Sequence, residues 1–276
     1  MTSFPIAIVL YNPSQSSIDR ILYFLEKGFV FYIFDNSKNQ NKILANINTP
    51  NLSYYSLNKN FGLSYSINYL CKVAISNHNK YLLFFDQDTI FKLETFDFIR
   101  DIITIKSDEQ NTLFEKVLSI NFRDAASTQS QLNIINIFSL NSISLYNVYF
   151  NINSGTLYFL DKYDKFNWFD EKYFVDGVDY SLSINAIVNN YKNLVVIDVP
   201  GLNHTEEQGD SKIIIFGKTL TGRIYPLKRN IDFIKSHLKL LLKSFRIRRI
   251  KPILFIIKAL ISYLFIQIVF RFKNNF

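Results

Sequence analysis

Two short acidic clusters are the parts of this sequence best suited to chemistry. Asp86-Gln87-Asp88 follows the apolar run 81–85, and Asp176-Gly177-Val178-Asp179 comes about ninety residues later. Two neighbouring carboxylates offer hard oxygen ligands to Mg²⁺ or Mn²⁺, and such an ion can bridge the phosphates of a ligand. A separate carboxylate can act as a general base. The two clusters therefore predict metal-assisted transfer from a phosphorylated donor.

Alternating strands and helices predict how the first cluster is positioned. Buried strands are expected at 4–11, 29–34, 52–57 and 81–85, with helices at about 16–25 and 63–75. Strands and helices that alternate at this spacing indicate βαβ units and a mostly parallel sheet. Open α/β sheets bind ligands outside the carboxyl ends of their strands. Asp86 and Asp88 are therefore expected at a ligand-binding edge of a Rossmann-like α/β fold.

The second half of the sequence predicts an antiparallel extension of this sheet. Short strand-like runs occur at 116–120, 132–138, 146–150 and 156–160, and a strand at 194–199 comes after a helix that begins near Asp179. No long helices are expected between the short runs, and no Gly/Ser-rich linker separates them from the first half. We therefore expect one α/β domain up to about residue 228.

The net charge of +8 is concentrated at the C-terminal end. No acidic residue follows Asp232, whereas ten lysines and arginines do. A basic tail on a nearly neutral body points to an anionic surface, either a membrane or a nucleic acid. Residues 231–243 predict an amphipathic helix, and residues 253–270 are apolar apart from Lys258, Ser262 and Gln267. Because the sequence has no recognised nucleic-acid motif, we favour the membrane.

The length of the apolar segment bears on whether it crosses the membrane. Eighteen helical residues would extend about 27 Å, slightly less than a hydrocarbon core of about 30 Å. Lys258 adds a charge a third of the way along the segment. We therefore predict that residues 229–276 are a peripheral or monotopic membrane-associating tail with both ends in the cytoplasm. The start of the sequence shows no signal peptide, and a single cysteine, Cys71, fits a reducing compartment.

An ordered set of motifs over residues 4–210 resembles a known family. The set consists of Tyr11-Asn12-Pro13, Asp35-Asn36-Ser37, Asn60-Phe61-Gly62 with Asn68, Asp86-Gln87-Asp88-Thr89, Ser154-Gly155-Thr156, Phe169-Asp170-Glu171, Phe174 to Asp179, and His204. It resembles the inverting family 2 nucleotide-sugar glycosyltransferases, which have the GT-A fold. Within that family it is most similar to the bacterial rhamnosyltransferase-type enzymes of surface polysaccharide assembly, such as O-antigen or capsule.

The resemblance implies a set of donor-binding residues and metal ligands. Asp35 matches the family's contact to the nucleobase imide, although a strand-to-helix cap is the alternative. Asn60 and Gly62, together with Tyr11, match donor-contacting positions, although an ordinary turn is an alternative for the Asn60-Phe61-Gly62 segment. The implied metal ligands are Asp88, Asp86 and His204, and Asp86 is also expected to contact the nucleotide. The alternatives are two solvated acids at a strand end and a structural histidine at position 204.

The resemblance also implies the catalytic residues. Asp179 matches the catalytic base, Asp176 is the alternate base, and a simple helix N-cap is the alternative for Asp179. The sequence departs from the family at Ser181 and Asn185, where many members have an acid and an arginine. Trp168 could stack on a sugar ring or pack in the core.

The implied activity is transfer of a sugar from a nucleoside-diphosphate donor to a lipid-linked oligosaccharide at the inner face of the cell membrane. The leading donor is dTDP-L-rhamnose, followed by a UDP-hexose or UDP-galactofuranose. Two alternatives stay open: a nucleic-acid-binding protein that uses the basic tail, and an inactive sugar-nucleotide-binding relative.

Overall fold

The computed structural model describes residues 4–107, 114–124, 134–140, 143–162, 165, 168–203, 211–215, 218–222 and 224–274. The chain divides into two compact units, Met1–His204 and Thr205–Phe276. The expected boundary near residue 228 falls inside the second unit, in the first turn of α7 (Leu227–Ser244).

The first unit is built on a nine-stranded sheet with the order β3-β2-β1-β4-β8-β5-β9-β7-β6. The strands are β1 Ile6–Leu10, β2 Phe31–Asp35, β3 Leu52–Ser56, β4 Tyr81–Asp86, β5 Val117–Phe122, β6 Ile134–Leu140, β7 Ile143–Val148, β8 Thr156–Phe159 and β9 Lys192–Val196. The first four strands are parallel, while β8 runs antiparallel to both β4 and β5. Strand β9 is parallel to β5, and β7 and β6 complete an antiparallel edge. The predicted parallel sheet with an antiparallel extension is confirmed.

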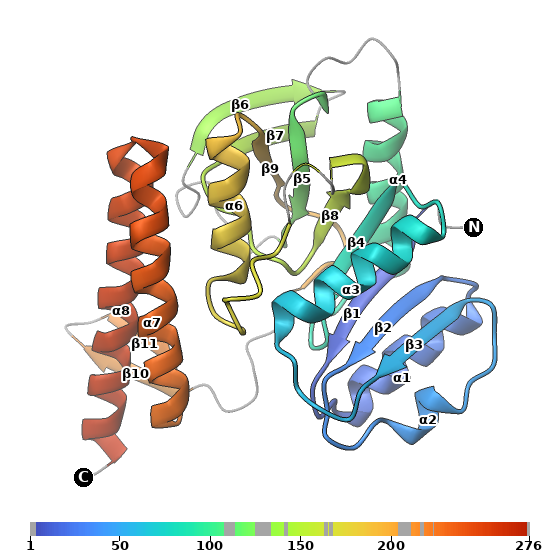
Figure 1. Ribbon diagram of the computed structural model, residues 1–276, viewed down its shortest axis with the longest axis horizontal. Helices are drawn as coiled ribbons and strands as arrows, with labels where there is room; N and C mark the ends of the chain where they lie inside the picture. Colours follow the sequence, from blue (N-terminus) through green and yellow to red (C-terminus); the bar gives the residue numbers. More distant parts are fainter. Residues whose placement is uncertain are drawn as a thin grey trace. The chain divides into compact units, whose positions relative to one another are not determined.

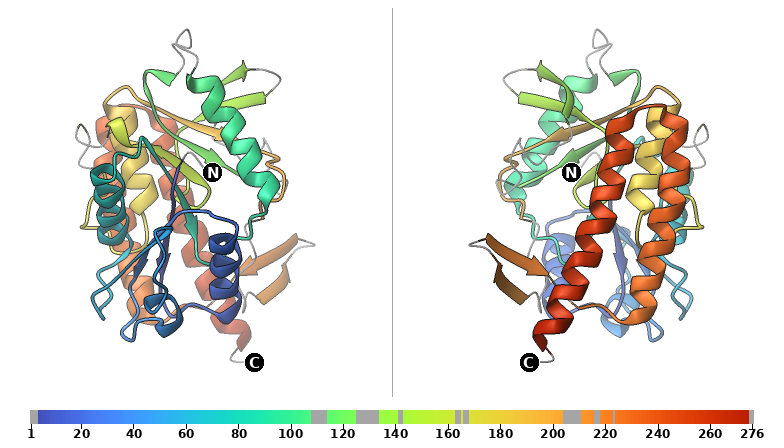
Figure 2. Two further views of the ribbon diagram at one scale, coloured as in Figure 1. Left: turned by 90° about the vertical axis from the view of Figure 1, so that its right-hand side faces the viewer. Right: turned by 90° about the vertical axis from the view of Figure 1, so that its left-hand side faces the viewer.

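Helices cover both faces of the sheet (Figures 1 and 2). They are α1 Gln15–Glu26, α2 Lys42–Ala45, α3 Leu63–Ser76, α4 Leu93–Ser107, the 3₁₀ turn η3 Leu160–Lys162, and α6 Val178–Val188. Helices α1 and α4 lie on one face, and α3 and α6 lie on the other (Figure 2). Helix α4 was not predicted, although Phe96, Ile99 and Ile103 are spaced at three and four residues, as on one face of a helix.

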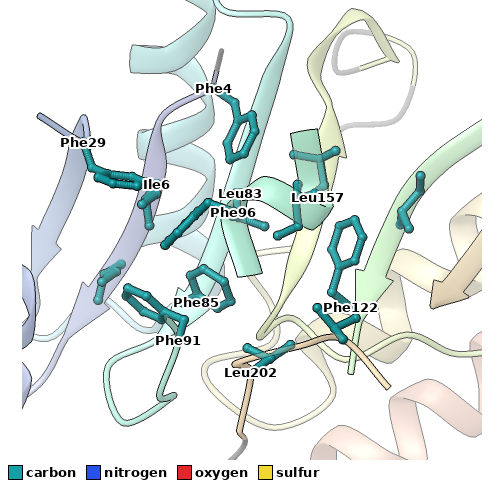
Figure 3. Packing of buried hydrophobic residues seen from close by; sticks show 14 of the residues in the cluster. Phe4, Ile6, Phe29, Leu83, Phe85, Phe91, Phe96, Phe122, Leu157 and Leu202 are labelled. Atoms are coloured by element: carbon teal, nitrogen blue, oxygen red, sulfur yellow. The ribbon is translucent and has the colours of Figure 1, made fainter. Parts of the chain in front are cut away.

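Aromatic side chains fill the core between the sheet and α1 with α4 (Figure 3). Phe85 of β4 stacks on Phe91 with ring centroids 4.5 Å apart, and Phe29 meets Phe96 of α4 at 4.5 Å. Strand β4 is buried on both faces, which explains why its sequence is a continuous apolar run. Trp168 is fully buried against Tyr158 in the core, as is Cys71. The core reading of Trp168 is confirmed, and the sugar-stacking reading was wrong.

The second unit contains a β-hairpin and two helices. Strands β10 (Ser211–Ile215) and β11 (Lys218–Gly222) pair antiparallel, and this hairpin was not predicted. The 3₁₀ turn η4 (Phe245–Ile247) joins α7 to α8 (Ile250–Asn274). Helix α8 starts two residues before Pro252. Proline is compatible with this position, because the backbone N–H groups of a first helical turn have no partner within the helix.

Helix α8 is longer than the apolar segment that the sequence analysis used. Its 25 residues correspond to about 37 Å, which exceeds a hydrocarbon core of about 30 Å. Among the residues that the structure describes, it is the one helix long and apolar enough to cross a membrane. The length argument against a membrane span was therefore wrong.

Candidate active site

Three strand ends meet where the order of the parallel strands reverses. Strand β1 lies between β2 and β4, and its register pairs Leu10 with Asp35 and Val9 with Asp86. Because all three strands run in the same direction, their carboxyl ends share one edge of the sheet. Open α/β sheets bind ligands at this kind of switch point. The topology thus brings together Tyr11, Asp35 and Asp86, which the sequence analysis assigned to the donor.

The turn after β4 is fastened to β1 and to α1. The Gln87 side chain accepts a hydrogen bond from the Tyr11 N–H (2.9 Å) and donates one to the Tyr11 carbonyl (3.3 Å). Arg20 of α1 donates to the carbonyls of Gln87 (3.3 Å) and Thr89 (2.9 Å). These contacts hold the backbone of Asp86-Gln87-Asp88-Thr89, called the acidic turn below, from two sides.

The same turn is also hydrogen-bonded to the turn before β8. The Asp86 N–H donates to Ser154 Oγ (3.1 Å), and Ser154 Oγ shares a hydrogen bond of 2.6 Å with Thr89 Oγ1. Asp86 is exposed, Asp88 is half-buried, and Tyr11 is 52% exposed. The backbone of the turn is therefore fixed while its carboxylates stay accessible to a ligand.

The accessible carboxylates of Asp86 and Asp88 suit a divalent cation. Both are hard oxygen donors on one braced turn, which is the chemistry that Mg²⁺ and Mn²⁺ prefer. Within the described part of the chain, no three His, Cys, Asp or Glu side chains gather into a possible metal site. His204, the predicted third ligand, lies outside the described residues. The assignment of Asp86, Asp88 and His204 as ligands stays a prediction.

Asp35 has a different environment from the one that the sequence analysis expected. Its carboxylate is fully buried and accepts hydrogen bonds from the Ser37 N–H (2.8 Å), the Asn41 N–H (2.9 Å) and the Tyr54 hydroxyl (2.6 Å). The N-cap of α2 is Asn41, so the alternative reading of Asp35 as a helix cap was wrong; its contacts organise the loop that leads to α2. Because Asp35 is fully buried, a nucleobase would reach it only if the surrounding loop moved, so that role stays a prediction.

Gly62 lies very close to the backbone and the ring of Phe174. Its φ of 86° and ψ of 169° lie in a region that is essentially restricted to glycine. A Cβ atom at this position would lie 2.7 Å from the Phe174 carbonyl oxygen and 2.7 Å from the Phe174 ring. The neighbouring Leu63 N–H donates to the same carbonyl at 2.6 Å, and Asn60 Oδ1 accepts from the Gly62 N–H at 2.8 Å. Gly62 thus allows the loop before α3 to pack on the loop before α6.

We expect Gly62→Ala to lower the free energy of unfolding by about 3 kcal/mol or more, because backbone strain and overlap add. Gly28→Ala is the matched control: Gly28 has a similar φ of 82°, but a Cβ there would meet nothing within 4 Å. Chemical denaturation of both variants checks this. An equal loss in both would contradict the role of the Phe174 contact.

Helix α3 holds the loop that precedes α6. Asn68 donates to the Phe169 carbonyl (2.8 Å) and accepts from the Phe169 N–H (3.2 Å), and Ser64 Oγ donates to the Tyr173 carbonyl (2.6 Å). These bonds join residues that are more than one hundred positions apart. They fix the start of α6, and therefore the second acidic cluster, relative to the parallel half of the sheet.

Asp179 lies in the first turn of α6. The N-cap is Gly177, so the alternative reading of Asp179 as the N-cap was wrong. Asp179 Oδ1 accepts the Tyr180 N–H at 2.8 Å. Burial raises the pKa of Asp179 to about 6; the charge of Asp176 adds to this, whereas the backbone N–H groups and Arg123 oppose it. A carboxylate with this pKa is ionised at neutral pH and is a stronger base than an ordinary aspartate.

Arg123 is a site residue that the sequence analysis missed. It follows β5, its Nε donates to Asn121 Oδ1 (2.7 Å), and Asn121 Nδ2 donates to the Ser154 carbonyl and to Thr156 Oγ1, both at 2.8 Å. Because Ser154 also holds Asp86, one hydrogen-bonded chain links the acidic turn to the cation beside Asp179. The signal was present in the sequence: polar Asn121 and Arg123 interrupt the end of an apolar strand.

The buried Tyr158 and a small polar cavity lie next to Asp179. Burial raises the pKa of Tyr158, and the charges of Cys71, Asp179 and Asp86 raise it further. The cavity, about 10 Å³, is lined by Tyr158, Asp179 and Asn151, among others. Within the described chain, Asn151 Oδ1 has no hydrogen-bond partner. The cavity is therefore the size and polarity of a site for one water behind Asp179.

Comparison with known proteins identifies the fold. No family model and no curated protein matches this sequence. The structure is similar to Staphylococcus aureus TarS (15% identity, TM-score 0.55, covering 87% of this chain and 39% of TarS). It is also similar to TarS 1–349 in complex with UDP-GlcNAc (15%, 0.55, 87% and 66%) and to GalNAc-T7 with UDP, GalNAc and Mn²⁺ (9%, 0.51, 84% and 47%).

These neighbours define the class of the protein at the level of its fold. Their sequence identities of 9% to 15% to this chain are low, so the likeness concerns the chain fold. The chain has the GT-A glycosyltransferase fold, and it spans about two fifths of the full TarS chain.

Proposed function

We propose that this chain is a metal-dependent, inverting glycosyltransferase that uses a nucleoside-diphosphate sugar. The observation that carries the proposal is an acidic turn with accessible carboxylates at the switch point of a GT-A sheet. Asp86 ends β4 and Asp88 follows it. Asp179, whose pKa is raised, is linked to this turn through Arg123, Asn121 and Ser154. TarS 1–349 with UDP-GlcNAc and GalNAc-T7 with UDP and Mn²⁺ support a nucleotide-sugar donor and a divalent metal.

On the donor side, Asp88 and Asp86 would hold Mg²⁺ or Mn²⁺, with His204 as the proposed third ligand. A bound divalent cation would neutralise the charge that builds on the departing diphosphate. Arg20 and Gln87 keep the acidic turn in place through backbone contacts. Tyr11 follows β1 and Asn60 follows β3, two parallel strands whose carboxyl ends share one edge, and both residues are proposed donor contacts.

On the acceptor side, Asp179 would remove the proton from the attacking hydroxyl. Inversion in one displacement needs a single base and no carboxylate nucleophile. Arg123 stabilises the ionised form of Asp179, so that the base stays available near neutral pH. Asp176 is the alternate base; it is half-buried in the loop just before α6.

The proposed substrate is L-rhamnose from dTDP-rhamnose, transferred to a lipid-linked glycan for O-antigen or capsule at the cytoplasmic face of the cell membrane. A UDP-hexose or UDP-galactofuranose is the alternative donor. The departure at Ser181 keeps an inactive sugar-nucleotide-binding relative as a second candidate, because this serine is fully buried and cannot replace an accessible acid.

A panel of nucleotide sugars, each with and without Mn²⁺, tests the proposal. A ligand that binds the native state raises the melting temperature by mass action. We expect metal-dependent stabilisation by at least one donor, followed by release of its nucleoside diphosphate in the presence of acceptor. Stabilisation without any hydrolysis or transfer would favour the inactive relative. No stabilisation by any donor would contradict both.

The pH dependence of turnover offers a separate test of Asp179 and Arg123. Because the base must be ionised, we expect kcat to rise with pH through an apparent pKa of about 6. The Arg123 cation lowers the pKa of Asp179. Arg123→Gln should therefore move the rise of kcat to higher pH and reduce turnover more at pH 6 than at pH 8. Arg100→Gln, at a half-buried position on α4 where the guanidinium pairs with Asp97, is the control and should leave the pH dependence unchanged. If kcat of Arg123→Gln rises at the same pH as in the parent, Arg123 does not control the pKa of Asp179.

A further inference from the structure

The seam between α7 and α8 is polar and aromatic. The Tyr263 hydroxyl of α8 donates to Asn230 Oδ1 of α7 at 2.7 Å, and Gln267 Oε1 accepts from the Tyr225 N–H at 3.0 Å. Phe233 of α7 stacks between His237 and Tyr263, with ring centroids 3.8 Å and 3.6 Å away. Asn230, His237 and Gln267 are all buried. The two helices thus bury polar side chains against each other.

The outer surface of the same two helices is apolar. Large hydrophobic side chains are exposed on α7 and on α8: Leu227, Ile231, Leu238 and Leu242, and Ile250, Leu254, Ile261, Phe265, Ile268 and Phe272. Only 17% of the most apolar stretch of α8 is buried, whereas the core helix of a soluble protein is mostly buried. This distribution is the reverse of that in a water-soluble helical hairpin, and it leaves an apolar surface much larger than isolated exposed residues produce.

The charges of the helical hairpin formed by α7 and α8 indicate what kind of partner covers this apolar surface. From residue 227 to the end, the sequence contains twelve lysines and arginines and one acid, Asp232. On α7, Leu238 and Leu242 form an apolar stripe at helical spacing, and Lys235, Lys239 and Lys243 form a basic stripe directly beside it. An apolar side beside a basic side fits an anionic lipid surface, where acyl chains meet the first and phosphate headgroups meet the second.

The pairing of the helices decides how the hairpin would lie. Helix α8 alone is long enough to cross a bilayer. However, α7 packs along it, since Tyr225 and Asn230 meet the C-terminal half of α8 and the short η4 turn joins the other ends (Figures 1 and 2). Crossing would carry Lys235, Lys239 and Lys243 into the hydrocarbon with α8, where charges are costly.

We propose that the α7–α8 hairpin lies in the plane of an anionic membrane interface, with its exposed apolar side chains in the acyl region and its lysines at the headgroups. The proposal deepens the membrane location given above and does not depend on the sugar-transfer chemistry. The reason against a membrane span is that α8 pairs with α7, a helix that carries lysines.

Spin labels at three positions distinguish an in-plane helix from a crossing one. Leu254, Ile261 and Ile268 are exposed and seven residues apart, so they share one side of α8. The single native cysteine, Cys71, is fully buried and leaves introduced cysteines as the labelling sites. Full-length protein labelled at each position would be bound to vesicles of equimolar phosphatidylglycerol and phosphatidylcholine, and label depth would be measured by oxygen and nickel-chelate accessibility.

We expect all three labels at the same shallow depth within the acyl region. Depths that change by about 10 Å from one position to the next, seven residues at about 1.5 Å each, would mean that α8 crosses the bilayer and would overturn the in-plane arrangement. Labels that stay in water, or protein that does not bind these vesicles, would overturn the lipid-facing surface itself.

A pair of variants tests the surface without relying on labels. Leu238→Gln with Leu242→Gln removes exposed apolar contacts of α7 and should weaken vesicle binding at least tenfold, at unchanged melting temperature. Ile43→Gln, an exposed apolar residue of α2, is the matched control and should bind like the parent. Lys239→Gln should lower affinity roughly fivefold on anionic vesicles and not on neutral ones. Wild-type affinity in the double leucine variant would refute the proposal.

Discussion

Replacing Asp179 with asparagine is expected to lower turnover by roughly 10²–10⁴-fold, the usual contribution of a general base. The amide keeps the size of the side chain but cannot accept the acceptor's proton. Donor and metal should still bind, because Asp86 and Asp88 belong to a different turn. Single-turnover rates with the donor identified by thermal stabilisation, together with donor affinity in Mn²⁺, check this expectation.

Stability separates lost chemistry from lost structure in this variant. The pKa of Asp179 in the folded state, about 6, lies above its usual value of 3.8, so ionisation of Asp179 opposes folding. Asparagine removes that penalty, and Asp179→Asn should melt at the same temperature as the parent or higher at pH 8. The difference should shrink as pH falls through 6 and disappear below 3.8.

Asp176→Asn is the matched variant, because it changes the neighbouring carboxylate just before α6. We expect it to keep most of the parent turnover and to shift the pH limb slightly downward, since the charge of Asp176 raises the pKa of Asp179. Near-parental turnover in Asp179→Asn with an inactive Asp176→Asn would transfer the role of base to Asp176.

Asp88→Ala is expected to abolish metal-dependent donor binding. Removing one of two neighbouring carboxylates takes away a direct ligand, so the loss of metal affinity should exceed the roughly 10–100-fold that follows loss of a supporting residue. Titration of donor in excess Mn²⁺, followed by calorimetry or fluorescence, measures the effect. The fold should persist, because the turn is held by the backbone contacts of Gln87 and Thr89.

Asp101→Ala supplies the control for a lost surface acid, since Asp101 is exposed on α4. It should leave donor affinity and its dependence on Mn²⁺ unchanged. If Asp88→Ala also keeps its metal-dependent donor affinity, Asp88 is not a ligand, and the acidic turn would have to bind the nucleotide without the cation.

The sequence by itself determined the parallel half of the fold and the position of the acidic turn. Buried parallel strands are continuous apolar runs, and β4 ends at Asp86 where its apolar run ends. Such runs are local signals, and the carboxyl ends of neighbouring parallel strands necessarily share an edge. The order of the motifs also indicated the GT-A fold. These conclusions needed no knowledge of long-range contacts.

Other features were decided by contacts between segments far apart in the sequence. Asp35 is fully buried because Tyr54 and the loop before α2 close over it, and nothing in the local pattern signals that closure. The positive φ of Gly62 accommodates Phe174, more than one hundred residues away. The pKa of Asp179 depends on burial in the fold and on Arg123, which follows β5 more than fifty residues earlier in the sequence.

For α7 and α8 too, the sequence predicted the two helices, whereas their pairing was decided by the tertiary structure. Composition determined that two helices of opposite character follow one another, one basic and one apolar. Only the tertiary structure decided that they pair through Asn230, Tyr263 and Gln267 and leave apolar side chains outside. The reason is physical: periodicity tells which residues share a face of a helix, whereas the partner of that face is chosen by the free energy of packing the whole chain.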